Sequence, residues 1–167
     1  MSDSRTEAAI KALVAALAAR AELPDAAIPA PLRNEALPAR MFDAGAGIET
    51  YLNVWDGSGE ITDEFLGADL GQGDGYQLAQ RPRIEWVVAG GTAADREAKF
   101  DAGLQDIRAA IAPVNSGGSL RFLAGAVDRS KIENIARAGS GLVTDGLPNI
   151  KSAEITVLLE FTSSDPF

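Results

Sequence analysis

The end of the chain carries the clearest secondary-structure signal in the sequence. Residues 151–161 read KSAEITVLLEF, in which apolar side chains alternate with mostly polar ones. Because successive residues of a strand point to opposite faces of a sheet, this alternation predicts a strand with one buried face. The remaining segments must therefore supply a sheet for this strand and a layer that covers the apolar face.

Two earlier segments also have the composition of strands. Residues 48–55 (IETYLNVW) and residues 83–89 (RIEWVVA) are rich in β-branched and aromatic side chains. Such side chains favour the pleated surface of a sheet. We expect these two segments to form a long antiparallel hairpin.

Two segments have the pattern of long amphipathic helices. In residues 4–21 the apolar side chains recur at helical spacing, and Ser4 is the expected N-cap. In residues 92–112 an apolar stripe again follows the helical period, with Thr92 as the expected N-cap. Each helix should bury one face against the sheet.

The other segments give weaker signals. The proline-rich residues 24–47 predict an extended connection, because proline disrupts regular pairing. Residues 119–127 predict a short strand, and residues 129–137 (RSKIENIAR) predict a short helix. Together the segments predict an α+β fold over residues 1–167: a single domain with a mainly antiparallel sheet and two long helices on one face.

The negative charge of the protein is concentrated in its middle. The net charge is -9, yet residues 41–80 contain eight acidic side chains and no Lys or Arg. Most of these acids lie in the glycine-rich segment 56–80, which we expect to form an arm at the tip of the hairpin. Because an acidic surface repels phosphates, the charge argues against ordinary DNA binding through a basic patch.

The sequence contains no Cys and no His. This composition excludes disulfides, thiolate nucleophiles, Cys/His zinc sites and an imidazole base. We therefore expect a protein that is not an enzyme. The sequence also shows neither the pattern of a signal peptide nor a stretch of about 20 apolar residues, which predicts a cytosolic location without a membrane partner.

A calcium loop is the first alternative for the acidic arm. Asp56, Ser58 and Glu60 occupy the first, third and fifth positions of a loop of EF-hand type. However, Ile61 stands where the turn requires Gly, and Gly67 stands where the bidentate Glu should be. We therefore expect no metal site in the arm.

Phosphate binding is the second alternative. Closely spaced glycines occur at residues 71–75, 90–91 and 139–141, but none leads into the Lys and Ser/Thr of a phosphate-binding loop. Asp74 would also repel a phosphate. Glycines at these positions are typical of turns, and we expect no cofactor.

Carboxylate catalysis and a stacking platform are the remaining alternatives. Asp63, Glu64 and Glu85 could include a catalytic pair only if two carboxyl groups lay about 5–10 Å apart. Trp55 and Trp86 could stack on a ligand, but their positions on the predicted strands are typical of core or sheet-face residues.

The acidic arm returns to the body of the protein through Arg81 and Arg83. In a ring, acids of one subunit could meet these bases on the next, although a solvated turn has equal support. Complementary charge of this kind would set the register of the contact. The candidate subunit-interface or lumen residues are Asp56, Glu60, Asp63, Glu64, Asp69, Asp74, Arg81 and Arg83.

The order of the segments is itself informative. An amphipathic helix comes first, and a proline-rich crossing follows it. Next, a strand that ends in VWD leads to the arm, and a second strand, IEWVVAG, runs into the helix REAKFDAGLQDIRAAIA. The last segment is the strand-like SAEITVLLEFTSSDPF. Over about residues 5–165 this layout resembles the tail terminator (tail completion) proteins of long-tailed bacteriophages and of related gene transfer agents.

The resemblance implies a structural role in the virion. It implies a hexameric ring that caps the tail tube, ends tube growth and joins the tail to the head connector. The implied partners are other copies of the chain, the tail tube protein, a head–tail connector or stopper protein, and DNA that passes through the lumen without specific binding. Assembly would take place in the host cytoplasm, where like-charge repulsion between acidic arms could keep free subunits apart.

Three other functions are compatible with the sequence. The chain could be another ring-forming neck or tail tube protein of the same particle. It could instead be a small enzyme of the acyl-transferase type, or a binding module with a calcium-dependent arm. The sequence lacks a Cys/His pair and a coenzyme signature, which argues against the enzyme.

Overall fold

The computed structural model describes residues 4–41, 44–65, 75–138 and 149–164. Its elements are α1 (Arg5–Ala21), β1 (Leu32–Arg33), η1 (Ala39–Met41), β2 (Ile48–Phe65), β3 (Gly75–Gly90), α2 (Ala93–Ile111), β4 (Val114–Ser116), β5 (Ser119–Arg121), η2 (Leu123–Gly125), β6 (Arg129–Ala138) and β7 (Ile150–Ser163).

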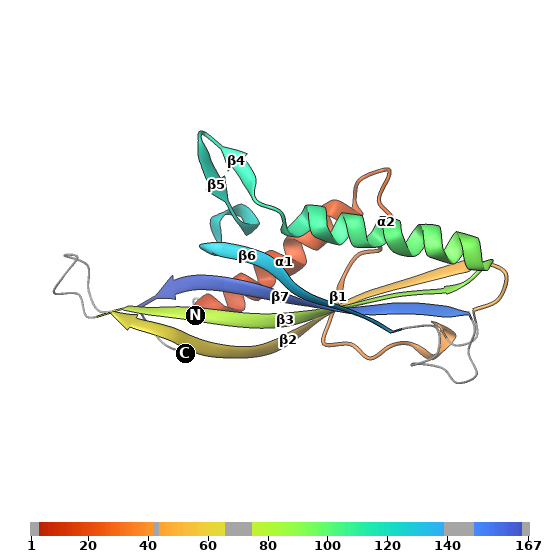
Figure 1. Ribbon diagram of the computed structural model, residues 1–167, viewed down its shortest axis with the longest axis horizontal. Helices are drawn as coiled ribbons and strands as arrows, with labels where there is room; N and C mark the ends of the chain where they lie inside the picture. The colour runs from red at the N-terminus through yellow and green to blue at the C-terminus, as the bar shows by residue number, and fades with distance from the viewer. Residues whose placement is uncertain (1–3, 42–43, 66–74, 139–148, 165–167) are drawn as a thin grey trace.

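Five strands form one sheet in the order β1-β2-β3-β7-β6. All neighbours are antiparallel except β1 and β2, which are parallel. Both helices lie on the same face of this sheet, and β4 and β5 form a separate hairpin that stands away from the body (Figure 1). The predicted α+β fold, with a mainly antiparallel sheet and two long helices on one face, is confirmed.

The main core lies between the helices and the sheet. Trp86 on β3 and Phe100 on α2 are both fully buried there, and their rings stack with centroids 6.5 Å apart. The Trp86 indole N–H donates to the Phe100 carbonyl oxygen over 3.1 Å. Gly103 permits this close approach, because a Cβ at that position would lie 2.3 Å from the Trp86 ring. The Trp86 side chain is thus a core residue and not part of a stacking platform.

A smaller core lies on the opposite face of the sheet, under the segment that contains η1. Its buried members are Met41, Tyr51, Val87, Ala89 and Ile150, with Leu37 packed against them. The Tyr51 hydroxyl donates to the Glu35 carbonyl oxygen over 2.5 Å. Burial raises the pKa of this hydroxyl to about 12, and the charges of Glu85 and Glu35 add to the effect. The proline-rich connection therefore covers one end of a face that the helices leave open.

Both helices begin where the sequence predicts. The Ser4 hydroxyl accepts a hydrogen bond from the backbone N–H of Glu7, and the Thr92 hydroxyl accepts one from Asp95. Helix α2 ends at Ile111. The next residue, Ala112, is extended, as expected for a residue that precedes a proline.

The predicted helix over residues 129–137 is wrong, because this segment forms β6. Ile132 pairs with Val157 and Ile135 pairs with Ile155, so a bulge adds one residue between the two isoleucines. The bulge lets two side chains three residues apart reach the same face of the sheet. Their spacing therefore imitates a helix.

Two further predictions need correction. The strand predicted over 119–127 is limited to β5, because Leu123, Ala124 and Gly125 have positive φ values of 46°, 57° and 87°. The predicted hairpin strands are also longer than expected, since β2 continues to Phe65 and β3 begins at Gly75. The base of the arm thus belongs to the main sheet, because Tyr76–Gln80 of β3 pairs with β2 on one side and with β7 on the other.

Candidate functional site

The face of the sheet opposite the helices carries mainly polar and charged side chains. In the register, Arg83 of β3 lies opposite Trp55 of β2 and Thr156 of β7, and Glu85 lies opposite Asn53 and Glu154. Directly opposed residues share one face of a sheet. We call this surface, away from the small core under η1, the open face.

Arg81 of β3 links three strands across the open face. Its guanidinium donates to Glu60 on β2 and, over 2.9 Å, to Glu133 on β6. Since β7 lies between β3 and β6, the two ion pairs together reach from β2 to β6. The hydrogen bonds from Glu60 and Glu133 raise the pKa of Arg81, so its charge is present and already matched by two carboxylates.

Two other bases of the open face are paired in the same way. Arg83 contacts Glu154 over 3.2 Å, and Arg129 contacts Glu160 over 3.6 Å. The Trp55 indole N–H donates to Glu85 over 3.3 Å. Each exposed pair contributes little to stability, but together they match every one of these arginines with a carboxylate.

Asp56 lies where the arm leaves the body, and it is tied to α1. Arg33 of β1 donates from Nε to Asp56 over 2.7 Å, and from both terminal nitrogens to the Glu7 carboxylate over 2.7 Å. These hydrogen bonds hold the pKa of both carboxyl groups below their ordinary values. The Glu7–Arg33–Asp56 cluster fixes the first helix to the edge of the sheet.

The structure places the predicted interface residues in different surroundings. Asp56, Glu60, Arg81 and Arg83 form the pairs just described within one chain. Asp63 is exposed on β2. Glu64 belongs to β2 but its side chain, like all of Asp69 and Asp74, lies outside the described residues. The structure thus brings an acid of the arm to Arg81 in the same subunit, and contacts with a neighbouring subunit stay a prediction.

Several residues of the open face were missed at the level of sequence. Glu154 and Glu160 occupy the polar side of the alternating pattern in β7, which is the signal that could have placed them. Glu133 had no such signal, because it lies at the bulge of β6.

The two side edges of the sheet differ in charge. Strand β1 pairs only with Asn53 and Val54, so most of β2 has no partner on its outer side among the described residues. Strand β6 is the other edge. Strand β2 holds five acids and no base, namely Glu49, Asp56, Glu60, Asp63 and Glu64, whereas β6 holds the three bases Arg129, Lys131 and Arg137 and one acid, Glu133.

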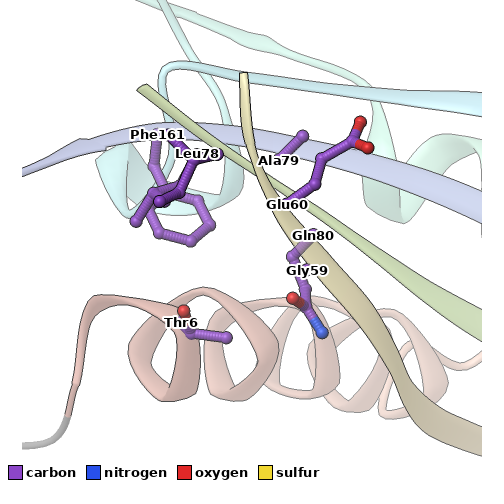
Figure 2. Close-up of a pocket in the computed structure, with 8 residues that line it drawn as sticks. Thr6, Gly59, Glu60, Leu78, Ala79, Gln80 and Phe161 are labelled. Carbon is purple, nitrogen blue, oxygen red and sulfur yellow. The ribbon is translucent and has the colours of Figure 1, made fainter. Parts of the chain in front are cut away.

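A pocket of about 440 Å³ lies between the first turn of α1 and the base of the arm. Figure 2 shows Thr6 on the helix facing Leu78, Phe161 and Gln80 across this space. The Gln80 side-chain amide donates to the Asp56 carbonyl oxygen over 2.7 Å. The wall is mostly apolar, and it includes Gly59 and Ile61 of the open β2 edge.

Two of the three candidate catalytic carboxylates, those of Asp63 and Glu85, do not come together. Asp63 pairs with Gln77 and Glu85 pairs with Asn53, so eight residues of β3 separate their positions, roughly 25 Å along a strand. That distance is far too long for a mechanism with two carboxyl groups. Among the described residues no group of three or more acids could hold a metal ion, and no helix there is long and apolar enough to cross a membrane.

Comparisons with known proteins add no family assignment. No protein-family model and no curated protein matches this sequence. The open face, the two charged edges and the pocket are therefore the features from which a function can be argued.

Proposed function

We propose that this protein is a structural ring protein that caps the tail tube of a long-tailed phage or of a gene transfer agent. In this role it forms a hexameric ring, ends tube growth and joins the tail to the head connector or stopper protein. It performs no catalysis. The protein is a component of the virion tail or neck and assembles in the host cytoplasm.

The opposite charges of the two sheet edges are the observation that carries this proposal. The acidic β2 edge and the basic β6 edge lie on opposite sides of the same sheet. Unpaired strand edges readily join another chain, and complementary charge fixes which edge meets which. Repeated head-to-tail contact between unlike surfaces generates a ring when the rotation closes.

The open face supports the orientation of the subunits in the ring. The helices cover the other face of the sheet, so the open face would line the lumen (Figure 1). Its arginines already have carboxylate partners, as Arg81 has in Glu60 and Glu133 and Arg83 has in Glu154. A wall with matched charges offers few free cations to DNA phosphates, so DNA can slide past without specific binding.

A second candidate is another ring-forming neck or tail tube protein of the same particle. The long β2–β3 hairpin favours this candidate, because its strands run for 18 and 16 residues, well beyond the helices (Figure 1). The two candidates share the ring and differ in whether rings of this protein stack on one another.

Electron microscopy of the purified protein, alone and mixed with tubes of the tail tube protein, tests the proposal. We expect six-fold rings, and one such ring at one end of each tube. Tubes made of this protein alone would favour the second candidate. A protein that stays monomeric at every concentration, with and without tubes, would overturn both.

A cap also has to stop tube growth. Addition of this protein to growing tubes should shorten them in proportion to its concentration, as measured from micrographs. Bovine serum albumin at the same concentration is the control for nonspecific inhibition. Unchanged tube length would contradict the terminator role even if rings form.

A further inference from the structure

The β4–β5 hairpin is a projection with no evident role within the subunit. Figure 1 shows it standing clear of both the sheet and the helices. All six of its strand residues are exposed. A single two-stranded hairpin is only marginally stable in water, so an exposed one gains from a partner.

The sequence of this hairpin nevertheless fits a specific tight turn. Gly117 and Gly118 have φ values of 62° and 83°, the left-handed conformation that a tight two-residue hairpin turn requires at both positions. The strands expose two large apolar side chains, Val114 at 66% and Leu120 at 63%. These are higher fractions than for any other large apolar side chain among the described residues. Val114 pairs with Arg121 and Leu120 pairs with Asn115, so the two apolar side chains lie on opposite faces of the hairpin, and a single contact can bury only one of them.

The pocket beside α1 has the complementary character. Its wall is mostly apolar, and Ile61 in this wall is 45% exposed. The pocket borders the part of β2 that has no strand partner on its outer side among the described residues. It is thus open toward the side of the sheet on which a neighbouring subunit would lie.

The hairpin and the pocket adjoin different edge strands of the sheet. The hairpin joins the end of α2 to η2 and β6, so it belongs to the basic edge, whereas the pocket belongs to the β2 edge. In a ring with the sheets inside, the outer helix layers of adjacent subunits spread apart. A hairpin that projects on the helix side is suited to bridge that gap.

We propose that the β4–β5 hairpin of one copy packs Leu120 into the pocket between α1 and the arm of the next copy. This inference rests on the proposed ring and adds its outer contact. Charge agrees with the pairing, because the hairpin carries Arg121 and no acid, while β2 beside the pocket carries acids and no base.

Cysteine cross-linking tests the contact directly, because the chain has no Cys of its own. Leu120→Cys protein is mixed with Ile61→Cys protein under ring-forming conditions and oxidised. We expect a disulfide-linked dimer between positions 120 and 61, since a disulfide needs Cβ atoms about 4 Å apart. Leu23→Cys, at an exposed site after α1, replaces Leu120→Cys as the matched control and should give no such product.

Association measurements test the energetic contribution. Leu120→Asp should weaken ring formation by about ten-fold or more, because it removes the burial of one Leu side chain. Leu23→Asp, a charge change at another exposed Leu, should leave it unchanged. Circular dichroism of both variants checks that the fold is retained.

The outcomes separate this inference from the proposed function. Rings that form normally with Leu120→Asp, or rings without a 120–61 cross-link, would overturn the hairpin contact and leave the ring in place. A cross-link from Leu120→Cys to the tail tube protein would also overturn it. A wild-type chain that never forms rings would overturn the ring and the hairpin contact together.

Discussion

Gly57 of β2 lies directly against the backbone of Arg81 on β3. A Cβ at position 57 would come 1.8 Å from the Arg81 carbonyl oxygen, and Gly57 has a φ of +72°. The register shows why, since Trp55 pairs with Arg83 and Ser58 pairs with Arg81. Two residues of β2 therefore lie opposite Pro82 alone, and the bulge falls at the residue that cannot donate a hydrogen bond.

This close approach predicts a strong effect of one methyl group. Gly57→Ala should lower the free energy of unfolding by about 2–4 kcal/mol, because Ala both clashes with β3 and disfavours positive φ. Urea denaturation followed by circular dichroism measures the change. Gly45→Ala is the control: a Cβ there meets nothing within 4 Å, and its effect should stay within about 0.5 kcal/mol. Equal effects of the two variants would contradict the account of the bulge.

Asp106 should be the most sensitive acid of α2. It is 4% exposed, and it accepts hydrogen bonds from the Arg20 side chain over 2.8 Å and from the backbone N–H of Ala27 over 2.5 Å. Asp106→Ala leaves a buried backbone donor without its acceptor, so the free energy of unfolding should fall by about 2–3 kcal/mol. Thermal and urea denaturation measure this loss.

The control for this prediction removes another carboxylate from the same helix. Asp101→Ala should change the free energy of unfolding by less than about 0.5 kcal/mol. Should Asp106→Ala behave like Asp101→Ala, the link between the end of α1 and α2 would not depend on Asp106.

The elements that sequence reasoning found are those with a regular period. The helices at Arg5–Ala21 and Ala93–Ile111 follow one apolar stripe each, and β7 alternates from Ala153 to Phe161 with Leu158 as the exception. Strand β6 was missed because its bulge between Ile132 and Asn134 turns a period of two into a spacing of three. Local patterns cannot reveal a bulge, because the paired strand determines where the extra residue fits.

The arm shows a second limit of sequence reasoning. Because proline disrupts pairing, the sequence predicts a strand that begins after Pro82. In the structure β3 continues through Pro82, because Gly57 permits a bulge in β2 opposite this proline. The same long-range register brings Arg81 to Glu60 and Glu133. Sequence composition offered a contact between acids and arginines of neighbouring subunits as one of two alternatives, and it could not show that such residues meet inside one subunit.

The stability of the protein should fall in acid through the Glu7–Arg33–Asp56 cluster. The pKa of both carboxyl groups is below its ordinary value in the folded protein. Their contribution is therefore present above the unfolded pKa of about 4 and is lost as the pH falls through the lower folded values. Because both carboxylates are partly exposed, the contribution at neutral pH is about 1 kcal/mol.

A variant isolates this contribution. Arg33→Gln should be less stable than the wild type at pH 7, and the difference should shrink as the pH falls below 4. Urea denaturation at pH 2.5 to 7 measures it, with the exposed Arg40→Gln as a control of equal charge change. A difference that is constant over this range would show that Arg33 acts through packing and not through charge.

Ring formation should weaken as salt increases. If the basic β6 edge of one copy meets the acidic β2 edge of the next, screening removes an attraction, and at 1 M salt the Debye length is only about 3 Å. Repulsion between acidic arms predicts the opposite trend, with association increasing at high salt. Sedimentation over a salt series distinguishes the two mechanisms.

A charge reversal on β6 tests whether the attraction between subunits arises at the sheet edge. Lys131→Glu on β6 should reduce association several-fold at low salt and match the wild type at 1 M, where screening has removed the difference. Lys99→Glu, on α2 and not on an edge strand, makes the same charge change and should have the smaller effect. If Lys99→Glu weakens association as much as Lys131→Glu, then overall net charge governs assembly, and the two edges do not recognise each other.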